Sequence, residues 1–71
     1  MTRPPDQPTT PFAERLRAAR EAAGMTQAQA ADAAGIRQPD WSDYETGNVQ
    51  PSLAQAARLA QAIGARLRDL I

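Results

Sequence analysis

The sequence predicts an all-α domain of five helices and no strands. N-cap signals precede alanine-rich stretches: Thr10 stands before Pro11, and Thr26 and Ser52 are each followed three residues later by a glutamine. Glycines follow the stretches, where a residue that can take a positive φ ends a helix. A chain of 71 residues has the size of one small domain.

The first predicted helix has Thr10 as its N-cap and Pro11 as its first residue, where the missing N–H of a proline costs nothing. Apolar residues recur at i, i+4, i+7 and i+11 and form one stripe, which consists of Phe12, Leu16, Ala19 and Ala23. Gly24 ends this helix. Its three arginines lie off the apolar stripe.

The second predicted helix starts near Gln27 and ends at Gly35. Thr26 and Gln29 form a capping box, in which each side chain accepts a hydrogen bond from the other residue's backbone N–H. Five alanines lie in this helix, and alanine is the best helix former. Gly35 can take a positive φ, and Ile36 fills the following turn as an apolar residue.

A third helix follows at once, with its N-cap at Arg37 or Gln38. Pro39 fits only the first turn of a helix, and the residue before a proline avoids helical angles. Trp41 and Tyr44 are three residues apart and are expected to point inward together, while Gln38, Pro39, Asp40 and Asp43 face outward. Gly47 ends this helix. Two short capped helices joined by a tight turn are the layout of a helix-turn-helix.

A fourth helix is predicted after a loop over residues 48–51. Ser52 and Gln55 form a second capping box, and the helix runs to about Ile63 before Gly64 ends it. Its expected buried face consists of Leu53, Ala56, Ala57, Leu59, Ala60 and Ile63. Leu67, Leu70 and Ile71 suggest a final short helix that either completes the core or presents a dimer surface.

Several residues and short motifs stand together at characteristic spacings: Leu16, Arg20, G-M-T-Q at 24–27, Ala31, Gly35-Ile36, Y-E-T-G at 44–47, Pro51-Ser52 and L-A-Q-A-I-G at 59–64. With these, residues 12–71 resemble the lambda-repressor/Cro-like (XRE-type) helix-turn-helix domains. The resemblance implies a five-helix lambda-repressor-like fold over residues 11–71, in which helices two and three form the helix-turn-helix. It also implies double-stranded DNA as the partner.

Residues 1–10 precede this domain and contain three of the six prolines among polar neighbours, so a flexible N-terminal arm is expected. Some family members grip DNA with such an arm. Arg3 is the only basic side chain here, which favours a plain disordered tail.

The composition excludes several kinds of chemistry. Cysteine and histidine are absent, so disulfides, zinc-finger sites, thiol nucleophiles and imidazole bases are excluded. No enzymatic activity, metal or cofactor is expected. The N-terminus lacks the apolar run of a signal peptide, and no stretch approaches the roughly 18 apolar residues of a membrane span. A cytoplasmic, nucleoid-associated protein is expected.

The resemblance places the third helix in the major groove, with its N-terminal residues against base edges. The matching positions are Arg37, Gln38, Pro39, Asp40 and Asp43, with Ser42 at the margin. Arg37 suits guanine, Gln38 suits adenine, and Asp43 can accept from a cytosine amine. Gln27 matches a family position that contacts phosphate and supports the recognition helix. The alternative is a glutamine that serves only solubility.

Two further sets of residues follow from the resemblance. Arg15 and Arg17 are candidate phosphate contacts, although solvated surface charges are the simpler interpretation, and Asn48 in the following loop is a third candidate. Arg20 and Glu45 match a family pair that joins the first helix to the end of the third, and we expect a structural salt bridge. Trp41 and Tyr44 are assigned to the core rather than to base stacking.

The charge balance departs from the family pattern. Eight arginines balance eight acids, there is no lysine, and residues 37–50 carry one positive and three negative charges. DNA-binding domains gain much of their affinity by neutralising phosphates. Two functions therefore stay open. One is a sequence-specific transcriptional regulator, a prokaryotic or phage repressor or an antitoxin-type autoregulator, that binds DNA as a homodimer. The other is a protein-interaction module of the same fold, with a partner such as a toxin.

Overall fold

The computed structural model describes residues 10–71, so the predicted arm, apart from Thr10, lies outside the described residues. The described part contains five helices and no strand, which confirms the predicted all-α class. The helices are α1 (Pro11–Ala22), α2 (Gln27–Ala34), α3 (Gln38–Thr46), α4 (Leu53–Ala62) and α5 (Leu67–Leu70). Thr10, the last residue of the predicted arm, is the N-cap of α1, which confirms the predicted start of this helix.

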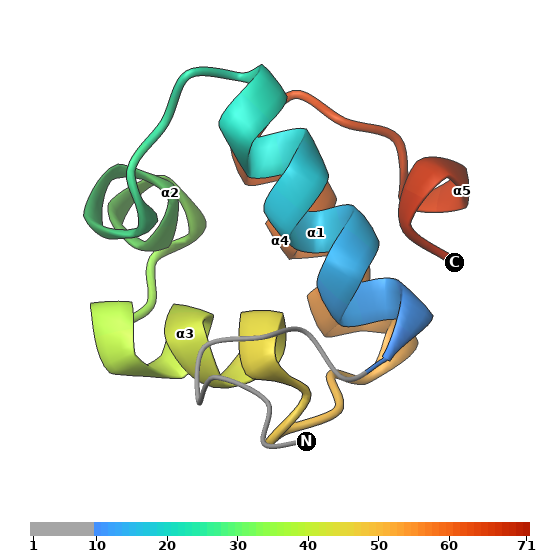
Figure 1. Cartoon of the computed structure of the whole chain (residues 1–71). Coiled ribbons are helices and arrows are strands. Elements are labelled where there is room, and N and C mark those ends of the chain that lie inside the picture. Colours follow the sequence, from blue (N-terminus) through green and yellow to red (C-terminus); the bar gives the residue numbers. More distant parts are fainter. Residues whose placement is uncertain (1–9) are drawn as a thin grey trace, which may run out of the picture.

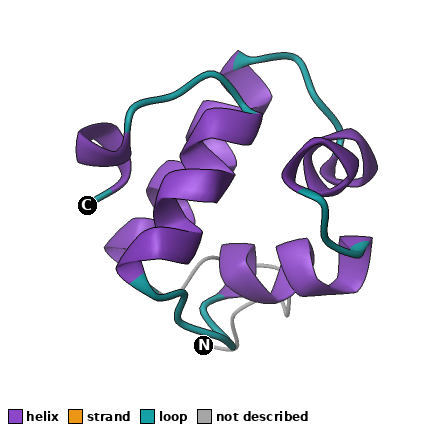
Figure 2. Cartoon of the chain, turned by 180° about the vertical axis from the view of Figure 1, so that it is seen from behind, coloured by secondary structure: helices purple, strands orange, loops and turns teal. Residues whose placement is uncertain are grey.

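The helices surround a single core (Figure 1). Helix α2 packs against α3 and α4, and α1 packs against α3 and α5. Seen from either side, α2 and α5 lie on opposite sides of α1 (Figures 1 and 2). In Figure 1, α2 is viewed almost along its axis while α3 lies across the view, so the two helices of the helix-turn-helix cross steeply.

The helix starts and ends follow the local signals. The Thr10 hydroxyl accepts a hydrogen bond from the Ala13 N–H at 3.0 Å. Both bonds of the Thr26–Gln29 capping box are present, at 2.9 and 3.1 Å. The second predicted box is only half present, because the Ser52 hydroxyl accepts from the Gln55 N–H at 3.1 Å without a reciprocal bond among the described residues.

The turn between α2 and α3 depends on Gly35. Its φ of 73° lies in the left-handed region, where a side chain is strained. This conformation lets the Ile36 N–H donate to the Ala31 carbonyl at 3.0 Å, which closes α2 in a Schellman-type end. Ile36 then packs against the core as the sequence predicts, and the chain starts α3 with Arg37 as N-cap.

All five helices contribute residues to the core. Trp41, Leu16, Leu59 and Leu70 are its largest fully buried apolar side chains, and Tyr44 packs against it from a half-buried position. The inward orientation predicted for Trp41 and Tyr44 is therefore confirmed. Burial of these large side chains supplies most of the hydrophobic stabilisation, since the alanines around them bury little area.

Three residues predicted to be buried are exposed. In α4 the buried stripe follows an i, i+3, i+4, i+7 pattern that consists of Ala56, Leu59, Ala60 and Ile63. Leu53 and Ala57 are one turn apart on a different face, so Leu53 is 66% exposed and Ala57 is also exposed. Ala23 is exposed because α1 ends at Ala22, before the apolar stripe reaches it.

Candidate nucleic-acid interface

The first turn of α3 presents the residues that the sequence assigns to base contacts. Arg37, Gln38 and Pro39 are exposed, and the Arg37 side chain is 82% accessible. The Arg37 Nε lies 3.3 Å from a carboxylate oxygen of Asp40, so this arginine forms a surface ion pair within its own helix. Such a pair contributes little to stability and can be exchanged for another anion.

The two aspartates of α3 form an acidic flank that begins in the first turn of the helix. Asp40 and Asp43 are half-buried and line a hollow of about 90 Å³ together with Ile36, Tyr44 and Val49. Ser42, predicted to lie at the margin, is half-buried and follows Gln38 by one helical turn. The predicted base-contact residues thus consist of an exposed start of α3 and an acidic flank, and the Arg37–Asp40 pair joins the two.

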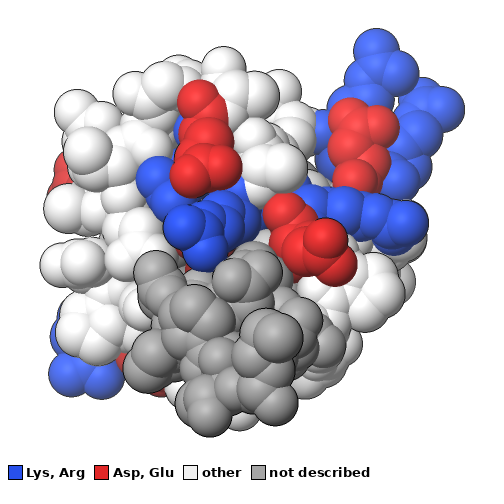
Figure 3. Space-filling view, viewed as in Figure 1, with Lys and Arg blue, Asp and Glu red and all other residues white. Residues whose placement is uncertain are grey.

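The candidate phosphate contacts lie apart from α3 in the chain. Arg15 and Asn48 are exposed, whereas Arg17 is half-buried and lies 3.7 Å from the Glu21 carboxylate. On the face seen in Figure 3, blue and red side chains lie next to one another and form no continuous basic surface. The structure agrees in this respect with the net charge of zero.

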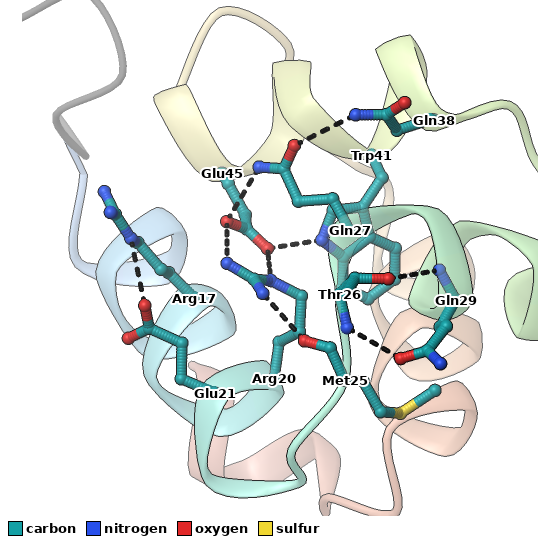
Figure 4. A network of polar contacts seen from close by, with 10 residues as sticks. All are labelled: Arg17, Arg20, Glu21, Met25, Thr26, Gln27, Gln29, Gln38, Trp41 and Glu45. Carbon is teal, nitrogen blue, oxygen red and sulfur yellow. Dashed lines mark hydrogen bonds and ion pairs between the residues drawn. The ribbon is translucent and has the colours of Figure 1, made fainter.

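Behind α3, a buried ion pair joins this helix to α1 (Figure 4). The Arg20 Nε donates to Glu45 Oε2 at 2.6 Å, and its Nη2 donates to Oε1 at 3.2 Å. The side chains are 12% and 2% exposed, respectively. The predicted structural salt bridge is therefore present, with the two-pronged geometry in which a guanidinium binds a carboxylate best.

The same pair is held by two further groups. The Trp41 indole N–H donates to Glu45 Oε2, and the Arg20 Nη1 donates to the Met25 carbonyl at 2.8 Å, just ahead of α2. Among the described residues, no buried side-chain nitrogen or oxygen lacks a hydrogen-bond partner. Full pairing is what makes a buried charge tolerable in a small core.

Gln27 connects this buried network to the surface of α3. Its Nε2 donates to Glu45 Oε1 at 3.2 Å, and its Oε1 accepts a long hydrogen bond of 3.5 Å from Gln38 Nε2 (Figure 4). Gln27 is half-buried and stands at the first position of α2. The start of α2 and the start of α3 are thereby joined through their side chains.

Sequence reasoning missed two of these contacts. It assigned Trp41 to the core for its apolar bulk and did not anticipate that its indole would reach Glu45. The signal was present, because position 45 follows position 41 by one helical turn and a buried indole N–H needs an acceptor. The contact of Gln27 with Glu45 spans 18 residues and leaves no local signal in the sequence.

The five helices, the glycine turn and the exposed start of α3 define a helix-turn-helix domain. A family model for helix-turn-helix domains matches residues 11–71, and the chain belongs to this family. No curated protein sequence matches the chain. The described helices include none that is long and apolar enough to span a membrane.

Two solved structures are similar to this one. The restriction-modification controller protein C.AhdI from Aeromonas hydrophila has a TM-score of 0.81 and 31% sequence identity, over 86% of this chain and 92% of that one. The clp gene regulator ClgR from C. glutamicum has a TM-score of 0.81 and 27% identity, over 84% of this chain and 78% of that one. Both likenesses extend over nearly the whole described part and confirm the fold that the resemblance implied.

Proposed function

We propose that this protein is a sequence-specific DNA-binding transcriptional regulator of the cytoplasm that inserts α3 into the major groove. The observation that carries this proposal is the exposed first turn of α3, which is joined to the start of α2 through Gln38 and Gln27, in a helix whose other end is fixed to α1 through Glu45. A rigid helix start with exposed polar side chains is what direct base readout requires. The likeness to two gene-regulatory proteins supports the same function.

Each residue has a proposed role. Arg37 exchanges its Asp40 partner for guanine, Gln38 contacts adenine, and Pro39 offers apolar contact to a thymine methyl group. The start of α2, with Gln27, faces a phosphate, where its backbone N–H groups and partial positive charge favour an anion. Ser42 and Asp43 lie further along α3 and act at the margin of the contacted bases. Arg15, Arg17 and Asn48 are auxiliary phosphate contacts.

We further propose a homodimer on DNA, supported by an apolar groove of about 300 Å³. Phe12, Pro51 and Leu53 line this groove together with Leu70 and Ile71 at the end of the chain. Leu70 is buried in the core, whereas Ile71 and Leu53 are 62% and 66% exposed. Pairing of two such grooves would cover the exposed apolar groups. It would also double the few phosphate contacts that one copy makes.

The test is selection from a pool of random duplex DNA, with binding measured by fluorescence anisotropy at about 50 and 200 mM salt. A sequence reader retains molecules that share a palindromic motif, with half-sites roughly 34–36 Å apart for a dimer. Arg37→Ala and Gln38→Ala should each erase part of that motif. The exposed Arg58→Ala, on α4, is a control for loss of charge alone. No retention at low salt would favour the protein-interaction module, in which the acidic flank of α3 binds a partner such as a toxin.

A further inference from the structure

The hollow beside α3 has no part in the roles proposed so far. It measures about 90 Å³ and is lined by Ile36, Asp40, Asp43, Tyr44 and Val49. This volume is larger than the roughly 30 Å³ that one water molecule occupies in the liquid. It is far smaller than the pockets of roughly 300–1,000 Å³ that enclose small-molecule ligands. The hollow therefore suits a methyl group that projects from a larger molecule.

The segments before and after α3 complete this hollow. Asp40, Asp43 and Tyr44 are spaced i, i+3 and i+4, so they share one face of the helix. Before the helix, the turn that closes α2 packs Ile36 against the core. After the helix, the Val49 N–H donates to the Asp43 carbonyl at 3.3 Å, which brings the loop back to α3 and leaves Val49 44% exposed. Apolar side chains from both segments thus adjoin polar groups of α3.

The two carboxylates at the hollow differ in what they already bind. Asp40 accepts from the Arg37 guanidinium at 3.3 and 3.5 Å. The half-buried Asp43 side chain makes no hydrogen bond or ion pair within residues 10–71. An ionised carboxylate only accepts, so Asp43 attracts a donor and opposes another acceptor. The hollow and Asp43 together match a methyl group that stands next to an N–H donor.

We propose that this hollow recognises the C5-methyl group of 5-methylcytosine in the major groove, while Asp43 accepts a hydrogen bond from the N4 amine of the same base. This inference rests on the proposed function, in which α3 lies in that groove, and adds to it a methylated base as the preferred ligand.

The edges of the pyrimidines explain why this base suits the site. In the major groove, cytosine presents the N4 donor, whereas thymine presents the O4 acceptor and the C5-methyl group. Thymine would fill the hollow but would set its O4 against the Asp43 carboxylate. Unmodified cytosine would satisfy Asp43 but would leave the hollow to water. 5-Methylcytosine has the donor and the methyl group side by side and satisfies both parts.

The test compares four pyrimidines at one position of the duplex that the wild type selects, the position whose base preference Asp43→Ala abolishes. Cytosine, 5-methylcytosine, uracil and thymine combine a donor or an acceptor with the absence or presence of the methyl group. In anisotropy titrations, the wild type should bind cytosine roughly 5- to 150-fold more tightly than uracil. Burial of the methyl group should make 5-methylcytosine bind roughly 4-fold more tightly than cytosine.

Two variants separate the two parts of the site. Asp43→Asn keeps the shape, but its amide can turn to donate or to accept, so the preference for cytosine over uracil should fall below about 3-fold while the methyl gain stays. Val49→Ala removes apolar contact, so the methyl gain should fall below about 2-fold while the preference for cytosine stays. Asp32→Asn is the matched control, because it makes the same change at an exposed position of α2 and should alter neither ratio. Thermal unfolding shows that each variant retains the fold.

The outcomes distinguish the inference from the function on which it rests. If the wild type retains no DNA, the proposed function fails and the inference fails with it. If the wild type reads a motif in which no preference depends on Asp43, or binds cytosine and 5-methylcytosine equally there, only the inference is overturned. Tighter binding of thymine than of 5-methylcytosine would overturn it, and so would a methyl gain that persists in Val49→Ala. Loss of the methyl gain in Val49→Ala with the preference for cytosine intact would support it most directly.

Discussion

Replacement of Arg20 by alanine tests whether the buried ion pair holds α3 in place. The change removes both guanidinium bonds to Glu45 and leaves the Met25 carbonyl without the donor it has at 2.8 Å. Glu45 would keep Trp41 and Gln27 as hydrogen-bond donors but would have lost its counter-charge at a site only 2% exposed. Removing one partner of a buried pair costs about 3–5 kcal/mol, because the other charge is left uncompensated.

That loss is large for a domain of this size. At roughly 0.05–0.15 kcal/mol per residue, a chain of 71 residues has a free energy of unfolding of about 4–11 kcal/mol. Each kcal/mol shifts the melting temperature of so small a domain by roughly 4–8 °C, so Arg20→Ala should melt at least about 12 °C below the wild type. Far-ultraviolet circular dichroism during thermal and urea unfolding measures the shift.

Two comparisons make the result specific to the buried charge. Arg15→Ala removes an exposed arginine from the same helix and should cost about 0.5 kcal/mol or less. The double variant Arg20→Met/Glu45→Met should be more stable than Arg20→Ala, because it leaves no stranded carboxylate. An Arg20→Ala protein that unfolds within about 2 °C of the wild type would refute the reasoning.

Three other predictions concern binding, assembly and the turn. Asp43→Arg should strengthen general DNA affinity and steepen the salt dependence by about one unit for a new phosphate contact, as measured by anisotropy titrations; an unchanged slope would argue against DNA near this flank. Leu53→Arg should place one copy instead of two on the palindromic duplex in sedimentation velocity if the proposed dimer on DNA forms through the apolar groove, while the melting temperature stays near that of the wild type, because this side chain is 66% exposed. Gly35→Ala should lower the stability by about 1–2 kcal/mol through its positive φ alone, since no atom lies within 4 Å of the added methyl group. A Gly35→Ala variant that unfolds at the wild-type denaturant concentration would contradict the role of this turn.

Helix boundaries were predictable because their causes are local. The hydroxyls of Thr10, Thr26 and Ser52 accept hydrogen bonds from backbone N–H groups three residues ahead. Each interaction therefore lies within four consecutive residues and can be predicted from them. The positive φ of Gly35 is likewise a property of one residue and its turn. The Arg20–Glu45 pair spans 25 residues and was expected only because of the family resemblance.

The exposure of Leu53 was not predictable from its own helix. Apolar spacing identifies residues that could share a face. Leu53 lies beside the stripe that contains Leu59 and Ile63, and spacing alone does not tell which part of this wide apolar face the neighbouring helices cover. Contact with α2 and α5 buries the stripe that includes Leu59 and Ile63 and leaves Leu53 in the groove beside Ile71. A wide apolar face thus became a core stripe and a separate exposed surface.

By itself, the sequence determined the class, the five helices, the glycine turn and the exposed tip of α3, since these depend on contacts within a helical turn or on the preferences of single residues. Tertiary structure alone decided that Gln27 lies between Glu45 and Gln38. This position depends on how α1, α2 and α3 cross, and crossing is set by packing against the shared core around Trp41. A buried carboxylate is thereby connected to a surface side chain of α3 through a residue 18 positions away in the sequence.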